Sequence, residues 1–329
     1  MKLFISITIA AMYGISIRLL YATFDNLLSV MSISFFFFVP YLIGYLTIIL
    51  LPYKERHTAT GAFFKPWLTC LVILIITCYA HIEGMICWIM AFPIFVIIAG
   101  LGGVVAFNRK RRRAQRMIEW DFEKDDWEKP GTLKISLLFL IPLFIGALEG
   151  DSTTTFQNLT VERQVEIGAS PEAVWAALTS SRQTVIKMSH PTLSGMIGFP
   201  YHLHTTLDKV AIGGQRIATY EKGLTFVETI HQMEPNRHLA VTIATDPSRI
   251  SKAIMDEHIV IGGKHIRMQG DEYTLQALPN GNTRLALASH FSINTPFNWY
   301  AGLWAKWLMS DVIHQELQSL RSAAGTKVL

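Results

Sequence analysis

Charge is the scarcest property of this chain. Only 16% of its 329 residues are charged, whereas an average soluble domain carries about 25%. Half of the residues are hydrophobic, and the mean hydropathy is +0.31. This composition excludes a disordered, collagen-like or simple cytosolic protein.

Charge is almost missing from five stretches in the first half of the chain. They run over residues 3–22, 33–51, 66–80, 85–107 and 133–148. A bilayer core of about 30 Å is crossed by about 20 apolar helical residues. The stretches therefore predict a transmembrane region of about five helices over residues 1–150. Residues 151–329 form a second domain in this interpretation.

The first stretch allows two interpretations. Met1-Lys2 before an apolar run is typical of a signal peptide. However, Arg18 lies late in the run and no small-x-small cleavage site follows. A retained helix is therefore favoured over a cleaved leader.

Basic residues are absent from two of the intervening loops. Loops 23–32 and 81–84 contain no Lys or Arg, whereas loops 52–66 and 108–132 together contain eleven. Basic loops favour the cytoplasmic side. The pattern predicts an integral protein of the inner or plasma membrane, with a cytoplasmic N-terminus and an extracytoplasmic C-terminal domain.

The run Arg109–Arg113 first suggests nucleic acid. Directly after an apolar stretch, it is better explained as a topology signal beside anionic lipid headgroups. Residues 151–329 carry 15 Lys and Arg against 15 Asp and Glu, so the net charge of +4 belongs to the first half. We therefore expect membrane lipids and no nucleic acid as partners.

Cysteine is nearly absent. Cys70, Cys78 and Cys87 lie in or beside the third and fourth stretches, and residues 151–329 contain none. A disulfide framework is thus excluded for the second half.

Three ionisable residues fall in or beside the apolar stretches. Glu83 and Glu149 both precede Gly at the predicted outer ends of helices, and Arg18 is their candidate partner. Ordinary interfacial charge and a polar site at the outer surface are both compatible with this placement.

The second half changes to an alternating apolar–polar period. This period predicts strands over residues 159–167, 215–220, 224–233, 238–245, 257–261, 271–278 and 283–293. Ser170-Pro171 is typical of a helix start, and residues 298–323 form one long C-terminal helix. The order predicts an α+β helix-grip fold, in which a curved antiparallel sheet covers the long helix.

Several segments resemble a known superfamily. The segment from Ile167 to Trp175 resembles the opening strand–helix signature of the SRPBCC superfamily (START-like, polyketide cyclase/dehydrase and lipid-transport proteins). Gly214–Arg216 and Gly223–Glu228 resemble its central hairpin, and the resemblance covers about residues 157–324. It implies a cavity for a hydrophobic ligand, but no particular reaction.

The whole chain also resembles a membrane-anchored subgroup of that superfamily. The shared features are Glu83-Gly84 before Cys87, Asp256-Glu-His258, Gly262-Gly263 and Phe297-Asn-Trp-Tyr300. No established activity is implied by this subgroup.

The central hairpin predicts one buried pair of charges. If Lys222 is the centre of the turn, Arg216 lies directly opposite Glu228, on the face shared by Leu224, Phe226 and Ile230. The pair is either a polar anchor for a ligand headgroup or a structural ion pair, since a buried charge needs a partner.

The predicted ligand contacts combine this pair with nearby aromatic residues. They are Arg216, Tyr220, Phe226, Glu228, Tyr273, Tyr300 and Trp304. Glu228 and His258 are weak candidates for a catalytic acid or base. His202 and His204 form an H-x-H without a further ligand at metal spacing, so no metal is predicted. No phosphate-binding glycine loop precedes a helix, so no cofactor is predicted either.

The long helix begins with Trp299, Tyr300, Trp304 and Trp307. A large contact with the core is our first interpretation, and contact with the membrane interface is the alternative. The apolar loop 195–200 is a candidate gate for a lipid-facing cavity.

Three functions remain open at this point. The favoured one is a membrane-anchored binding module for a lipid or another hydrophobic small molecule. The others are a polyketide cyclase- or hydrolase-like enzyme on a hydrophobic substrate, and a sensory or structural envelope protein. Neither the ligand nor the oligomeric state follows from the sequence.

Overall fold

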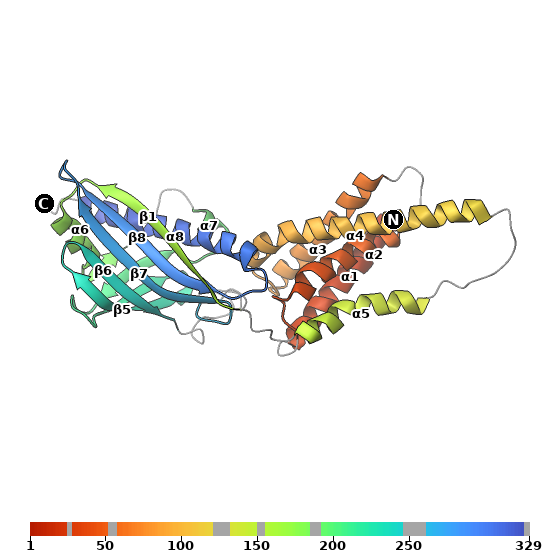
Figure 1. Ribbon diagram of the computed structural model, residues 1–329, viewed down its shortest axis with the longest axis horizontal. Helices are drawn as coiled ribbons and strands as arrows, with labels where there is room; N and C mark the ends of the chain where they lie inside the picture. Colours follow the sequence, from red (N-terminus) through yellow and green to blue (C-terminus); the bar gives the residue numbers. More distant parts are fainter. Residues whose placement is uncertain are drawn as a thin grey trace. The chain divides into compact units, whose positions relative to one another are not determined.

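The computed structural model describes residues 1–24, 28–51, 58–120, 132–149, 155–184, 192–245 and 261–325. The chain divides into two compact units, Met1–Thr153 and Thr154–Leu329. We call them the helical unit and the sheet unit (Figure 1).

The described residues of the helical unit form five α-helices. They are α1 (Lys2–Thr23), α2 (Val39–Ile49), α3 (Ala59–Tyr79), α4 (Met85–Trp120) and α5 (Thr132–Glu149). A π-helical turn, η1 (Ser34–Phe38), leads directly into α2. Thr58 caps α3, because its hydroxyl accepts a hydrogen bond from the Gly61 amide at 3.0 Å.

The prediction of five spanning helices is wrong. By length and composition, three helices in the described chain can cross a membrane: Lys2–Thr23, Ala59–Tyr79 and Met85–Gln115. The apolar helices Ser34–Ile49 and Leu140–Glu149 are shorter. At 1.5 Å per residue, Ser34–Ile49 is about 24 Å long, which is below a bilayer core of about 30 Å.

Helix α2 is enclosed although it is short. Nine of its eleven residues are buried. A Cβ atom added at Gly44 would lie 1.8 Å from the main-chain oxygen of Ala99 in α4, and one at Gly102 would lie 2.0 Å from that of Tyr41. Glycine at both positions therefore permits direct backbone contact between α2 and α4, as is common where membrane helices pack.

Charged groups are separated between the two ends of the helical unit. At one end, the Lys110 ammonium donates to the main-chain oxygens of Ile48, at 3.0 Å, and Leu51. At the other end, Arg18 pairs with Glu83. Glu149 accepts a hydrogen bond from the Ser34 amide at 3.1 Å. Glu83 is thus the partner of Arg18, as the sequence suggested. Glu149 instead accepts the hydrogen bond at the start of η1.

Within its described residues, the sheet unit forms an eight-stranded antiparallel sheet with the order β1-β8-β7-β6-β5-β4-β3-β2. The strands are β1 (Gln157–Ile167), β2 (Arg182–Thr184), β3 (His202–Leu207), β4 (Gln215–Tyr220), β5 (Thr225–Glu234), β6 (His238–Ala244), β7 (Ile266–Ala277) and β8 (Thr283–Ile293). The helices are α6 (Pro171–Leu178), α7 (Leu193–Met196) and α8 (Asn298–Gly325). Figure 1 shows α8 lying along the sheet behind β1 and β8.

The structure confirms an antiparallel sheet with a C-terminal helix. Ser170 caps α6 through the Ala173 amide, and the 3₁₀ turn η2 (Glu221–Gly223) joins β4 to β5. Gly223 adopts a φ of +83°, which a residue with a side chain rarely tolerates. The apolar–polar alternation did not predict β2 and β3, which are short and flank the apolar loop in the sequence. Most of the predicted strand 257–261 lies outside the described residues.

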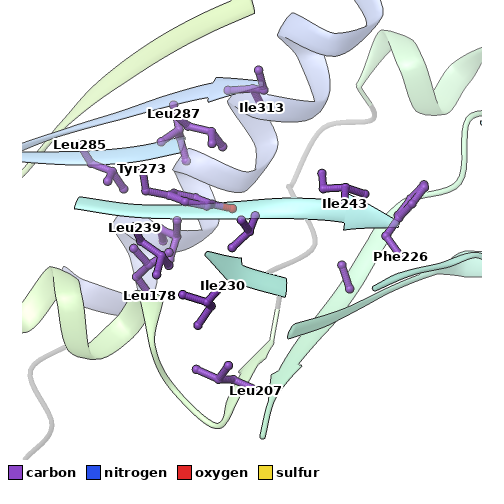
Figure 2. Packing of buried hydrophobic residues seen from close by; sticks show 14 of the residues in the cluster. Leu178, Leu207, Phe226, Ile230, Leu239, Ile243, Tyr273, Leu285, Leu287 and Ile313 are labelled. Carbon is purple, nitrogen blue, oxygen red and sulfur yellow. The ribbon is translucent and has the colours of Figure 1, made fainter. Parts of the chain in front are cut away.

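The core of the sheet unit lies between the sheet and the second half of α8. Ile313, Leu317 and Leu320 of α8 pack with inward-facing residues of the sheet. Figure 2 shows Ile313 beside Leu287 of β8, with Tyr273 and Leu239 in the same cluster.

The close contact between α2 and α4 predicts a packing defect on substitution. Gly44→Leu places a side chain against the Ala99 carbonyl, and overpacking of this kind costs at least about 1–3 kcal/mol. We expect a lower midpoint of thermal aggregation for the full chain in detergent. Val105→Leu is the control, because Val105 is exposed on the same helix α4. Equal midpoints for the two variants would contradict the contact.

Candidate functional site

The centre of the sheet unit contains a buried arginine. The register of β4 and β5 places Arg216 opposite Glu228, which confirms the predicted pairing. The Nη1 atom of Arg216 lies 3.1 Å from Oε2 of Glu228. The two side chains are 1% and 8% exposed. The guanidinium of Arg216 is therefore buried together with an acidic partner on the neighbouring strand.

Helix α8 supplies a second carboxylate. Oε1 of Glu316 lies 3.9 Å from Nη2 of Arg216 and accepts a hydrogen bond from the Tyr273 hydroxyl at 2.5 Å. The guanidinium carbon of Arg216 lies 5.1 Å from the centre of the Tyr273 ring. This distance is typical of a cation–π contact. The cluster thus joins β4, β5, β7 and α8.

A third acidic residue, Asp271, faces the same interior. It is buried on β7, two residues before Tyr273, and its cross-strand neighbour is Ser289 on β8. Its charge interacts with those of Glu228, Glu316 and Arg216. We call Arg216, Glu228, Asp271, Tyr273 and Glu316 the polar cluster.

Burial dominates the protonation of the polar cluster. It raises the pKa of Glu228 to about 7, although the Arg216 charge opposes the shift. Burial and the other two carboxylates raise the pKa of Asp271 to about 8. Burial would lower the pKa of Arg216, but Tyr273, Glu228 and Glu316 outweigh it and keep the pKa above its usual range. Arg216 therefore stays charged, while Glu228 and Asp271 can bind protons near neutral pH.

Five of the predicted ligand contacts come together. Tyr220 and Phe226 pack edge-to-face at 5.2 Å and share one core cluster with Tyr273. Burial raises the pKa of Tyr220, and the next contribution comes from the charge of Glu316, in the polar cluster. Aromatic and apolar side chains therefore surround Arg216, Glu228 and Tyr273.

The structure places Tyr300 and Trp304 in another part of α8. Their rings lie 6.4 Å apart, and Trp304 packs in turn against Trp307. At 1.5 Å per residue, they precede Glu316 by about 24 Å and about 18 Å along the helix. The polar cluster and these two residues therefore do not form one site.

Of the histidine candidates, the structure describes His202 but not His258. His202 stacks on Tyr220 at 4.7 Å and contacts the Thr205 hydroxyl at 2.9 Å. Burial lowers its pKa. His258 lies outside the described residues. Within the described part of the chain, no group of three His, Cys, Asp or Glu side chains is placed to hold a metal ion.

Loop 195–200 is attached to α8. The Ser194 amide just before it donates to the Asp311 carboxylate at 3.0 Å. The Gln315 amide donates to the hydroxyls of Thr192 and Ser194 at 3.0 and 3.1 Å. These bonds tie the predicted gate to the helix that carries Glu316.

Sequence reasoning missed Glu316 and Asp271. Glu316 lies three residues after Ile313 and four before Leu320, so a carboxylate interrupts an apolar helical stripe. Asp271 shares its strand face with Tyr273 and Leu275. Both signals were present, but each resembles ordinary surface charge until the partner Arg216 is placed.

The comparisons with known proteins agree with this geometry. The family model described as "Polyketide cyclase / dehydrase and lipid transport" matches residues 158–325, about half of the chain. The chain belongs to this family. The resemblance to the SRPBCC superfamily is thereby confirmed for the sheet unit, which is a domain of a hydrophobic-ligand binding family. A comparison with curated protein sequences finds no match.

Several solved structures are similar to the sheet unit at low identity. Truncated norcoclaurine synthase from Thalictrum flavum is 9% identical, with a TM-score of 0.34, over 54% of this chain and 98% of that one. Zhui aromatase/cyclase from Streptomyces sp. R1128 is 15% identical, with a TM-score of 0.34, over 53% and 97%. A START superfamily protein from Mycobacterium smegmatis is 13% identical, with a TM-score of 0.33, over 50% and 96%. These values are too low to support an argument about ligand or reaction.

The raised pKa of Asp271 predicts a titration near neutral pH. The folded chain holds a proton on Asp271 that the unfolded chain loses near pH 4, so its stabilising effect is lost as the pH rises from about 4 through about 8. We expect an infrared band of a protonated carboxyl group that disappears as the pH rises through about 8. Asp271→Asn should remove this component, whereas Glu162→Gln on the exposed face of β1 should not. An unchanged band in Asp271→Asn would contradict the assignment.

The enclosed ion pair predicts a large loss of stability when one partner is removed. Arg216→Met leaves Glu228 without its cation, and breaking a buried pair costs about 3–5 kcal/mol. We expect faster hydrogen exchange in peptides from β4 and β5 of the full chain. The effect should be larger at pH 8 than at pH 6, because Glu228 is protonated below about pH 7.

The control for this prediction is an exposed pair on the outer face of the same sheet. His290 and Glu272 approach to 3.6 Å and are 33% and 48% exposed. Glu272→Gln should change exchange in β7 and β8 by no more than about 1 kcal/mol. Similar effects at the two pairs would show that Arg216 is not held as described.

Proposed function

We propose that the sheet unit binds a lipid or another hydrophobic small molecule between the sheet and α8. One observation carries this proposal. Arg216 is almost completely buried and Nη1 lies 3.1 Å from Glu228, yet neither Nη1 nor Nη2 makes a hydrogen bond of good geometry to the described chain. A buried guanidinium needs acceptors for its five donors. Oxygen atoms of a ligand headgroup would supply the acceptors that Glu228 and Glu316 leave open.

The surroundings of Arg216 support an apolar body for the ligand. Tyr220, Phe226 and Ile230 belong to the same buried cluster as Leu317 and Leu320 of α8. Binding sites for small molecules are typically apolar with a few polar groups that orient the ligand. Membership of a hydrophobic-ligand binding family supports the same conclusion.

We further propose that the helical unit anchors this domain in the inner or plasma membrane, as in the membrane-anchored subgroup that the chain resembles. Three apolar helices of sufficient length support this proposal. Lys110 binds the end of α2, so Leu51 and the basic run from Arg109 lie at the same end of the unit. The positive-inside rule assigns that end to the cytoplasm. On this proposal, the sheet unit that follows α5 lies on the extracytoplasmic side.

An enzyme is the second candidate. Glu228 and Asp271 have pKa values near 7 and 8 inside an enclosed cluster, and such values are typical of acid–base groups. Structural networks shift pKa values as well. The same assay can separate binding from turnover.

Native mass spectrometry of the full chain after purification in mild detergent tests the proposal. We expect a co-purified hydrophobic molecule in the wild type and at least a tenfold lower occupancy in the double variant Arg216→Met, Glu228→Gln. This double variant removes Arg216 together with its nearer partner, so Glu228 is not left as a buried charge without a cation. The control is Glu272→Gln, which alters the exposed pair and should retain the molecule.

Two results would contradict a binding module. Equal occupancy in the wild type and the double variant would remove the role of Arg216. Time-dependent conversion of the bound molecule, abolished by Glu228→Gln in a chain that still binds it, would favour the enzyme.

A further inference from the structure

The first turns of α8 carry large aromatic side chains that point away from the core. Trp299 is 68% exposed, Leu303 is 64% exposed, and Trp307 is also exposed. Their spacing of four residues places them on one face of the helix. We call these three residues the aromatic ridge. The first interpretation from sequence, a large core contact for the helix start, is therefore incorrect for this face.

Small residues occupy the opposite face of the same turns. Ala301 and Ala305 pack against the cluster of Leu159, Phe291 and Ile293. A Cβ atom at Gly302 would lie 3.5 Å from Ile293. The helix thus approaches β1 and β8 through its smallest side chains. Burying Trp299 or Trp307 in the core instead would stabilise a soluble domain, so their exposure requires another explanation.

The ridge lies where the chain enters the sheet unit. The Asn298 side chain at the start of α8 donates to the main-chain oxygen of Thr155 at 3.5 Å, and Gln157 pairs with Ile293. Thr155 follows Glu149, the last residue of the apolar helix α5, by six residues. Six residues reach at most about 20 Å. The aromatic ridge is therefore tethered to the region of the chain that we assign to the membrane.

Basic side chains occur at the same end of the sheet unit. Lys306 is exposed within the ridge turns of α8. The guanidinium carbon of Arg267 lies 4.1 Å from the centre of the Phe156 ring. His265 is hydrogen-bonded to the main-chain oxygen of Asn294. Trp together with Lys or Arg is typical of segments that lie in the headgroup region of a bilayer.

We propose that the aromatic ridge docks into the lipid headgroup region of the membrane that holds the helical unit. The docked ridge would hold the sheet unit at the bilayer surface and orient α8 relative to it. Lipid is the one occupant that accounts for the exposed Trp residues, the basic neighbours and the short tether together. This inference goes beyond ligand binding, because it does not require Arg216 to bind anything.

Nitroxide accessibility tests this proposal in the full chain. In a background in which Cys70, Cys78 and Cys87 are replaced by Ala, a single Cys is introduced and labelled. The chain is reconstituted in vesicles of phosphatidylcholine and phosphatidylglycerol. Leu303→Cys reports on the ridge. His314→Cys is the matched control, since His314 is exposed on the same helix about 16 Å further along.

We expect the label at residue 303 to collide with oxygen as in lipid. Its collision rate with a water-soluble nickel complex should be at least fivefold lower than that at residue 314. Equal nickel accessibility at the two positions would overturn the proposal. Spin–spin broadening at 303 between labelled copies would also overturn it, because a second chain would then cover the ridge.

A third label separates this proposal from the membrane assignment. Ile97 is exposed near the middle of α4, so Ile97→Cys should be shielded from nickel and accessible to oxygen. A shielded residue 97 with a nickel-accessible residue 303 overturns the docked ridge alone. Nickel access at 97 overturns the membrane assignment and the docked ridge together. Neither result depends on whether native mass spectrometry finds a bound molecule.

Discussion

The sheet unit depends on the enclosure of one guanidinium. Placing Arg216 in the interior costs several kcal/mol of hydration, and the carboxylates that offset this cost come from different elements. Glu228 lies on the adjoining strand, whereas Glu316 comes from α8. The sheet and the long helix are therefore held in a definite relation by charge as well as by apolar contact. The same group has donors that the described chain does not satisfy with good hydrogen-bond geometry, which connects stability to the proposed ligand binding.

The two halves of α8 serve different environments. Ile313, Leu317 and Leu320 bury an ordinary apolar stripe against the sheet, and Glu316 lies beside that stripe with its carboxylate on Tyr273. The first turns instead contact β1 and β8 through small residues and leave the aromatic ridge outside. A single helix can thus join the interior of the sheet unit to its proposed contact with lipid.

In the helical unit, the buried helix α2 is held by backbone contact rather than by a buried charge. Helix α2 is shorter than the three helices of spanning length, yet it is buried among its neighbours, and Gly44 and Gly102 let its backbone touch that of α4. Polar contacts at the two ends, Lys110 with α2 and Arg18 with Glu83, fix charged groups that would be costly without partners. The five apolar stretches thus correspond to three helices of spanning length in the described part of the chain.

The sequence by itself determined the two-part character, the antiparallel sheet with its C-terminal helix, and the opposition of Arg216 and Glu228. These features are local or periodic: charge content, alternation, and a hairpin whose turn sets the register. Only the tertiary structure decided that Glu316 and Asp271 join the polar cluster, that Tyr300 and Trp304 lie apart from it, and which face of α8 is buried. The physical reason is distance along the chain. Residues 216 and 316 meet only when a helix packs across a sheet, and no spacing within either segment encodes that contact.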